Sequence, residues 1–228
     1  MPINQLTEDG FGMLVGSSGS EPFSFGNALQ FDGTDDYVDY SEINFSPSFT
    51  VSIWFKTDET YQNHLVTNSD GVRGLRITET VLTLVTLAGG RNFTLGSAIT
   101  LSAWNHVVIT RDILNVCNVY VNGIASINNG VGFGGDLPLS SFGRRASLRN
   151  AYTLDEAAVW DINLSSSECN SLYNSGNGDY ATNYSPANLI AYWRCNETDG
   201  ATTLTDEQGN YDGTLNNFST PPAYFIPH

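Results

Sequence analysis

The feature that most constrains the fold is an alternation of apolar and polar residues with a period of two. In residues 49–56, "FTVSIWFK", every second residue is Phe, Val or Ile, and Trp54 and Lys56 belong to the alternate set. A period of two places successive side chains on opposite faces of a β-strand, so this segment predicts a half-buried strand. Residues 104–110, "WNHVVIT", alternate in the same way and predict a second strand.

Turn signals separate these strands at short intervals. The pair Asn122-Gly123 follows the strand-like run "NVCNVYV" and tolerates the positive φ angles of a tight hairpin turn. Further strand patterns occur in "GLRITETVLTLVTL" and "LDEAAVWDI". Many short strands with turns every 8–12 residues predict an all-β protein with two packed antiparallel sheets.

One segment departs from the strand pattern. In "LSSSECNSLYNSG", Ser165 or Ser166 is a candidate N-cap and Glu168 lies in the first turn, while Leu164, Cys169 and Leu172 form an apolar stripe. This pattern predicts one short helix.

The charge balance restricts the possible partners. The chain has 9 Lys and Arg against 24 Asp and Glu, a net charge of −15. A protein that binds nucleic acid or an anionic membrane needs a basic surface, so both are excluded as expected partners. The surplus of carboxylates suits calcium, although it would also serve solubility alone. The three cysteines, Cys117, Cys169 and Cys195, indicate buried free thiols and no disulfide framework.

The chain divides into two unequal parts. Residues 1–26 are rich in Gly and Ser and predict an extended N-terminal arm, which could contact another copy of the chain or a neighbouring protein. Residues 27–228 contain the strand patterns and predict a single sandwich domain.

Five segments in order resemble a known family: "ALQFDGTDDYVDY", "FTVSIWFKT", "WNHVVITRD", "VYVNG" and "LDEAAVWDINLSSSECNSLYNSG". The series resembles the laminin-G-like, concanavalin A-like jelly-roll family from Asn27 to Gly178. The resemblance implies a jelly-roll sandwich of two antiparallel sheets. Residues 188–220 also look like the family but stand in a permuted position, where they would complete the sheets. This arrangement is similar to surface proteins of phage virions.

The resemblance implies a structural calcium ion bound by the Asp of the "FDG" turn and the Asp of the "LDE" strand. The matching residues are Asp32 and Asp155. Calcium takes six to eight oxygen ligands, which carboxylates and turn carbonyls can supply. The alternative is that Asp32 forms an Asx-turn and Asp155 accepts hydrogen bonds from nearby backbone.

The sequence offers little support for an enzyme, although the same fold also carries glycoside hydrolases. A retaining hydrolase needs two carboxylates about 5–5.5 Å apart. The segment Glu197-Thr198-Asp199 lacks the further Glu of the related hydrolases, and Asp155 and Glu156 are adjacent and therefore expected on opposite faces. We expect a non-enzymatic protein.

Candidate ligand-binding residues combine aromatic faces with planar hydrogen-bonding groups, as sugar sites do. They are Trp54, Tyr61, Arg73 and Arg76, each of which could instead be structural. A second group, Arg144, Arg145 and Arg149, could pair with acidic residues of another subunit or balance acidic residues nearby.

Together these features predict a surface-exposed binding or structural module. We expect a decoration or fibre protein on a phage virion surface, or otherwise an extracellular protein, with glycans on a host surface as possible ligands. The alternatives are a carbohydrate-binding lectin domain of a cellular protein and, third, a glycoside hydrolase.

Overall fold

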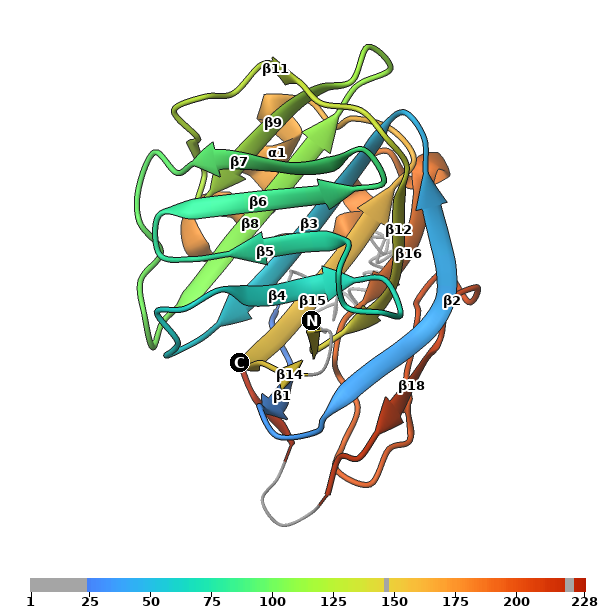
Figure 1. The fold of residues 1–228 in the computed structure, drawn as a ribbon. Coiled ribbons are helices and arrows are strands. Elements are labelled where there is room, and N and C mark those ends of the chain that lie inside the picture. The colour runs from blue at the N-terminus through green and yellow to red at the C-terminus, as the bar shows by residue number, and fades with distance from the viewer. Residues whose placement is uncertain (1–23, 146–147, 220–223) are drawn as a thin grey trace, which may run out of the picture.

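The computed structural model describes residues 24–145, 148–219 and 224–228. Within these residues the chain forms two antiparallel sheets packed face to face, with one short α-helix on the outside (Figure 1). This confirms the predicted jelly-roll sandwich. The predicted arm falls almost wholly on residues 1–23, which lie outside the described residues.

The first sheet has β3 and β15 at its centre, where they pair with each other. Additional pairings attach β11 to β9 and β16 to β15. Its strands, in spatial order, are β10 (Ile124–Ala125), β9 (Val116–Val121), β8 (Trp104–Arg111), β3 (Phe49–Lys56), β15 (Ala151–Trp160), β1 (Asn27–Asp32) and β19 (Phe225–Pro227), with β11 (Val131–Gly132) and β16 (Leu189–Trp193) off this path.

The second sheet has eight strands and ends in a row of four, β4 to β7, joined by short turns. A separate hairpin of β13 (Arg144–Arg145) and β14 (Leu148–Arg149) lies beside β4. In spatial order the second sheet contains β17 (Thr203–Leu204), β18 (Gly213–Asn216), β2 (Tyr37–Phe45), β12 (Leu137–Phe142), β4 (Asn63–Thr67), β5 (Gly74–Ile77), β6 (Val81–Thr86) and β7 (Gly89–Thr94).

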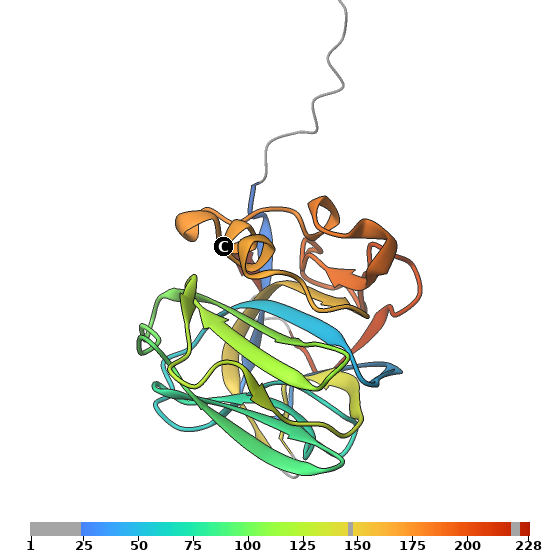
Figure 2. The same cartoon turned by 90° about the horizontal axis from the view of Figure 1, so that it is seen from above.

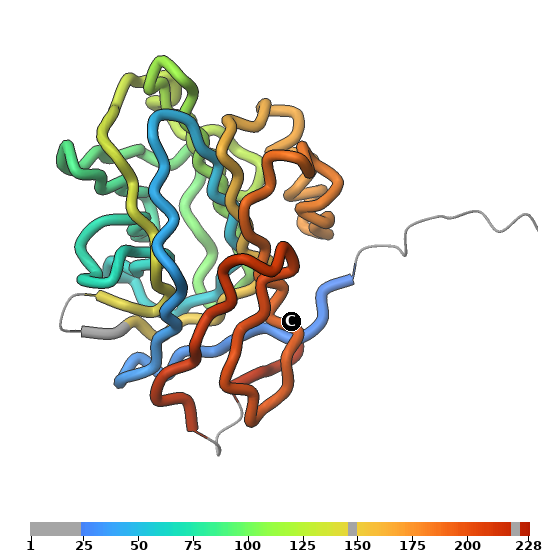
Figure 3. Tube along the Cα trace, turned by 90° about the vertical axis from the view of Figure 1, so that its right-hand side faces the viewer, coloured from blue at the N-terminus to red at the C-terminus, as the bar shows by residue number. Residues whose placement is uncertain are grey.

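Residues 188–219 contribute one strand to the first sheet and two to the second. β16 pairs with β15 in the first sheet, and β18 pairs with β2 in the second. Figure 3 shows this part of the chain running alongside β2. Its Trp193 is fully buried between the sheets and contacts Tyr40 and Phe142, so the segment supplies part of the main core.

The alternation in residues 49–56 places the two sets of side chains as predicted. Phe49, Val51, Ile53 and Phe55 join the core between the sheets. The other face is not exposed, however, because α1 (Ser166–Tyr173) and the short 3-10 turns that follow it cover the outer side of the first sheet (Figure 2). The prediction of a half-buried strand was therefore wrong: β3 is buried on both faces.

A second apolar cluster fills the space under α1. It combines outward side chains of the first sheet with the inner face of the helix and with the 3-10 turns, and so fixes the helix on the sheet. Its buried members are Val108, Ala158, Trp160, Leu164, Cys169, Leu172, Ala181, Leu189 and Tyr192.

The local predictions for the hairpin and the thiols are confirmed. Asn122 and Gly123 connect β9 to β10 with φ values of 50° and 72°, which a type I′ turn requires. All three cysteines are buried and free. Among the described residues, the helices fall short of the length and apolar character needed to cross a bilayer.

The helix begins with a capping box. The Ser165 hydroxyl accepts a hydrogen bond from the Glu168 backbone N–H, and the Glu168 carboxylate accepts one from the Ser165 backbone N–H. The two bonds satisfy backbone donors that lack partners within the helix. Of the two predicted candidates, Ser165 is the N-cap.

We expect Ser165→Ala to lower the free energy of unfolding by about 1 kcal/mol, because it removes the hydroxyl that accepts from the Glu168 backbone N–H. Urea unfolding monitored by circular dichroism measures the change. Ser167→Ala is the matched control, since Ser167 is exposed in the first turn, and should leave stability nearly unchanged. Equal effects of the two substitutions would contradict the assignment of the cap.

Candidate functional site

The two sheets differ in what covers their outer faces. The outer face of the first sheet lies under α1 and the 3-10 turns (Figure 2). The outer face of β4 to β7 faces the viewer in Figure 1, and no helix or further sheet of the described residues covers it. A ligand therefore has direct access to the second sheet.

A row of four polar side chains crosses this open face. His64 on β4 pairs in register with Arg76 on β5, Arg76 with Thr83 on β6, and Thr83 with Asn92 on β7. Neighbouring strands are about 4.8 Å apart, so the row extends for about 14 Å. The Thr83 hydroxyl donates to Asn92 Oδ1 over 2.9 Å.

The row faces outward because the intervening residues face the core. Leu75 and Ile77 on either side of Arg76, and Leu82 and Leu84 on either side of Thr83, are fully buried between the sheets. The same alternation that builds the core thus exposes a line of hydrogen-bonding groups.

His64 is the buried end of the row. Its side chain lies beneath neighbouring groups, and its Nδ1 is 3.2 Å from the Gly71 carbonyl, which assigns the proton to Nδ1. Burial, together with the charges of Arg76 and Arg145, lowers the pKa of His64 to about 4. The imidazole is therefore neutral at physiological pH.

Tyr61 and Arg145 border the row at the β4 end. Tyr61, in the loop before β4, is 65% exposed, and the Arg145 guanidinium lies 4.7 Å from the centre of its ring. An exposed aromatic ring next to planar hydrogen-bonding groups is the usual composition of a sugar-binding surface.

Three of the four predicted ligand-binding residues lie at or beside this face. Tyr61 borders it, Arg76 is part of the row, and Arg73 lies in the turn between β4 and β5, where it pairs with Asp70 at 3.2 Å. The sequence analysis did not select His64, Thr83 and Asn92 as ligand-binding residues. These residues alternate with core residues along their strands, and this alternation could have identified them as outward-facing.

Trp54 does not belong to this site. It lies on the outer face of the opposite sheet and is only 4% exposed, because Phe25, His106 and Tyr173 pack against it. The prediction that Trp54 contacts a ligand was wrong. Its polar neighbour His106 is held by Ser52, whose hydroxyl is 2.7 Å from Nε2.

A bulge in β15 changes the positions of Asp155 and Glu156. The register with β3 shifts between Asp155 and Ala158, and Glu156 takes the left-handed φ of 46°. Both carboxyl groups then lie on the outer side of the first sheet, where they are buried. The prediction that they point to opposite faces was wrong, because an extra residue in a strand interrupts the alternation.

Each buried carboxyl group has specific partners. Asp155 Oδ2 is 2.6 Å from His228 Nδ1, while the carboxyl group of Glu156 contacts the Tyr192 hydroxyl and Arg194 Nε. Burial raises the pKa of both carboxyl groups to about 8 and lowers the pKa of His228 to about 4. A protonated Asp155 carboxyl group that donates to neutral His228 gives both side chains a hydrogen bond without burying a charge.

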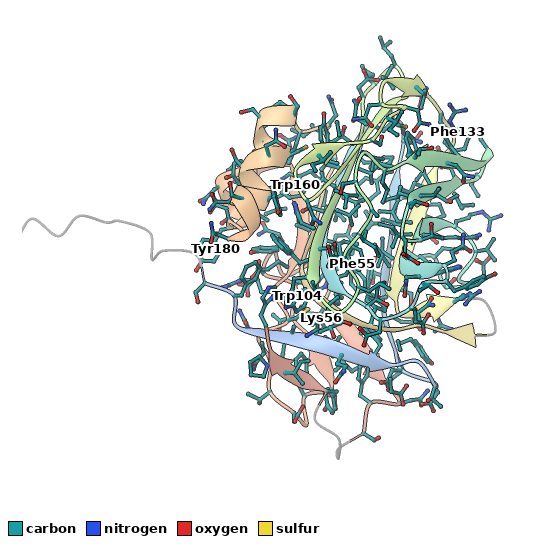
Figure 4. All side chains as sticks on the ribbon, turned by 90° about the vertical axis from the view of Figure 1, so that its left-hand side faces the viewer. Phe55, Lys56, Trp104, Phe133, Trp160 and Tyr180 are labelled. Atoms are coloured by element: carbon teal, nitrogen blue, oxygen red, sulfur yellow. The ribbon has the colours of Figure 1, made fainter. Side chains whose placement is uncertain are left out.

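Aromatic rings close this network off. The His228 ring stacks between Trp104 and Phe25, with ring centres 3.8 Å and 3.5 Å apart. Figure 4 shows Trp104 next to Lys56 on this side of the first sheet, and the Lys56 ammonium lies 5.5 Å from the centre of the Trp104 ring. The carboxyl pair thus connects β15, β16 and the 224–228 segment inside the protein.

The turn at Asp32 does not include Asp155. Asp32 pairs in register with Ala151, so Asp155 lies four residues further along β15, about 13 Å away. Asp32 instead has Asp35 and Asp36 as neighbours, with carboxylate oxygens within 4.8 Å of one another. The implied pair of calcium ligands therefore does not fit this structure.

In the acidic turn, residues 32–36, carboxylates accept hydrogen bonds from backbone N–H groups, as in an Asx-turn. Asp32 Oδ1 accepts from the Thr34 N–H at 2.6 Å, and Asp36 Oδ2 accepts from the Asp32 N–H at 2.9 Å. Burial and the charges of Asp32 and Asp35 raise the pKa of Asp36 to about 6. A calcium ion at Asp32 stays a prediction; the sequence did not predict Asp35 and Asp36 as its ligands.

The candidate hydrolase segment has structural roles. Asp199 Oδ1 accepts from the backbone N–H groups of Tyr224 and Phe225, and Glu197 Oε1 accepts from that of Thr205. These carboxylates hold the 224–228 segment and the β17 region in place.

We expect stability to fall between pH 6.5 and 8 because of the buried carboxyl pair. The folded state retains protons on Asp155 and Glu156 that the unfolded chain releases above pH about 4.5. His228 has the opposite effect, but only between pH about 4 and 6.5. Urea unfolding at several pH values should give a flatter profile above pH 6.5 for Asp155→Asn/Glu156→Gln than for the wild type. Parallel profiles would contradict the raised pKa values.

If calcium binds the acidic turn, EDTA will lower the melting temperature and Asp32→Ala will abolish that shift. Calcium would act by neutralising three neighbouring carboxylates. Asp161→Ala, which removes an exposed carboxylate elsewhere, should retain the EDTA response. A melting temperature that EDTA leaves unchanged, after the protein has been saturated with calcium, would exclude the site.

Comparison with solved structures supports the fold. A protein of Bacteroides ovatus, described as a candidate carbohydrate-binding protein, superposes with a TM-score of 0.63 and 20% identity over 88% of this chain and 60% of its own. A pentraxin of Limulus polyphemus (TM-score 0.44, 16% identity, 63% and 83% coverage) and a sialidase of Trypanosoma rangeli (0.47, 19%, 68% and 28%) are also similar. The chain therefore spans about three fifths of the length of the Bacteroides protein.

No curated protein sequence matches the chain. Residues 32–170, more than half of the chain, match the family model described as the concanavalin A-like lectin/glucanase superfamily, under the name Laminin_G_3. The matched range includes the acidic turn, all of β4 to β7 and the bulged strand β15. The chain belongs to the concanavalin A-like lectin/glucanase superfamily.

Proposed function

We propose that the protein is a non-enzymatic carbohydrate-binding module that binds a glycan on the open outer face of β4 to β7. The observation that carries this proposal is the polar row of His64, Arg76, Thr83 and Asn92 on an uncovered sheet. The row is about 14 Å long, which is enough for two to three sugar rings. Tyr61 provides an aromatic ring at one end.

The superfamily and the similarity in fold to the Bacteroides protein support a carbohydrate ligand. Asn and Thr side chains can both donate and accept hydrogen bonds, as sugar hydroxyl groups require, and Arg adds planar donors. Binding across several strands would use a rigid surface, so little conformational entropy would be lost on binding.

A hydrolase is less consistent with this face. Hydrolysis of a glycosidic bond needs an acid and a second carboxylate beside the bound sugar. The outward residues of the row carry no carboxyl group. The paired carboxyl groups of Asp155 and Glu156 lie on the opposite sheet, where His228 and Tyr192 contact them.

The expected setting is an extracellular or virion surface, on which the module would be exposed to host glycans. An attachment through residues 1–26 to other virion proteins or to another copy of the chain belongs to this proposal. Detection of the chain by mass spectrometry in purified virus particles would test the setting; its consistent absence from such particles would count against it.

The binding face is tested first with the full chain on a glycan array, followed by titration calorimetry with the best ligand. We expect Asn92→Ala and Tyr61→Ala each to weaken binding about tenfold, because each removes one hydrogen-bonding or aromatic contact. The control Ile113→Ala changes an exposed side chain in the β8–β9 turn and should bind as the wild type does. Unchanged affinity in both site variants would place the ligand elsewhere.

A further inference from the structure

The positive charges of this acidic protein are concentrated on one part of its surface. Of 9 Lys and Arg in a chain of net charge −15, four come from the β4–β5 turn, β5 and β13. The hairpin lies beside β4, where the Thr67 hydroxyl donates to the Arg144 carbonyl. The four are Arg73, Arg76, Arg144 and Arg145.

Two of these arginines are neutralised by carboxylates. Arg144 donates to both oxygens of Asp39, at 3.2 and 2.6 Å, and Arg73 pairs with Asp70 at 3.2 Å. In both pairs the carboxylate neutralises the charge of the guanidinium group, so these two arginines would attract an anionic ligand less strongly.

Arg76 and Arg145 are different. Among the described residues, neither has a carboxylate at ion-pairing distance. Arg76 donates to the Val72 carbonyl, but its Nε is buried and has no hydrogen-bond partner within the described part of the chain. A buried donor without a partner costs free energy that a bound acceptor would restore.

Arg76 and Arg145 both lie near His64, because Arg76 pairs with His64 in register and β13, which carries Arg145, packs against β4. The charge of Arg145 contributes, after burial, to lowering the pKa of Arg76, and both arginines act on His64. Arg145 is also positioned over the Tyr61 ring, 4.7 Å from its centre. Two unneutralised cations next to an exposed aromatic ring form a site for an anion that is attached to an apolar or ring-shaped body.

The overall charge limits what this anion can be. An extended polyanion such as nucleic acid would meet a protein of net charge −15 beyond this one patch. The patch covers the end of a row that would hold only a few sugar rings. A single charged group on a sugar fits this geometry.

We propose that Arg76 and Arg145 bind the carboxylate or sulfate group of an acidic sugar, whose ring lies against Tyr61 and whose neighbouring sugars follow the polar row. This inference rests on the proposed function and names its ligand class: acidic glycans rather than neutral ones. The two arginines set the specificity, while Thr83 and Asn92 contact the sugar hydroxyl groups.

The test compares pairs of ligands that differ only in charge, by titration calorimetry with the full chain. Sialyllactose against its carboxyl methyl ester tests a carboxylate, and a heparin-derived oligosaccharide against its desulfated form tests a sulfate. We expect the charged member of at least one pair to bind about tenfold more tightly. Raising NaCl from about 50 to about 500 mM should remove most of this preference.

Two substitutions locate the charge recognition. Arg76→Gln and Arg145→Gln should each reduce affinity for the acidic ligand about tenfold and leave neutral binding unchanged. Arg144→Gln is the matched control, because it removes the same charge from the same hairpin but from a residue that Asp39 already neutralises. Arg145→Lys should retain part of the affinity, and thermal melts verify that each variant is folded.

The outcomes separate this inference from the proposed function. Equal affinity for charged and neutral ligands, on a face that Asn92→Ala still disrupts, overturns the charge preference and leaves the carbohydrate-binding function intact. A charge preference that both glutamine variants retain overturns the assignment to Arg76 and Arg145. Absence of binding to every sugar, on the array and in solution, overturns both proposals.

Discussion

The burial of apolar side chains between two facing sheets is the interaction on which the rest of the structure depends. Inward residues such as Phe55, Leu75 and Trp193 come from segments far apart in the sequence, and together they form one continuous core. Because side chains alternate along each strand, this packing also determines which residues face outward. The composition of both outer faces is thus a consequence of the core.

The two outer faces have different fates. On the first sheet, α1 and the aromatic groups around His228 cover the surface, and the buried carboxyl pair of Asp155 and Glu156 becomes part of the interior. On the second sheet, β4 to β7 stay open and carry the polar row, which includes Arg76, while Arg145 lies on the neighbouring strand β13. Perturbed pKa values are often used to locate functional sites. Here the carboxyl groups with the most strongly raised pKa values, Asp155 and Glu156, are buried in the first sheet, and the residues that we assign to ligand binding lie on or beside the second.

Features with a local cause could be predicted from the sequence. The alternation around Ile53, the Asn122-Gly123 turn and the cap at Ser165 each depend on a few neighbouring residues, and the structure contains all three. The order of family-like segments indicated the sandwich, which the family match supports. The sequence also indicated Tyr61 and Arg76 as candidate ligand-binding residues, and in the structure Tyr61 is exposed and Arg76 faces outward.

Features that depend on long-range packing could not be predicted in this way. Trp54 alternates correctly but is buried by Phe25 and Tyr173, which the strand pattern does not reveal. The bulge at Glu156 reverses the expected facing of a carboxyl group, and the separation of Asp32 from Asp155 follows from strand register. The polar row itself exists only because three hairpin registers align His64, Arg76, Thr83 and Asn92.

Amide NMR spectra recorded during titration with sialyllactose test the central claim, that ligands bind the open sheet, most directly. We predict that the largest shifts occur in β4 to β7 and around Arg145. Shifts confined to residues 32–36, or to the first sheet around Trp104, would contradict it.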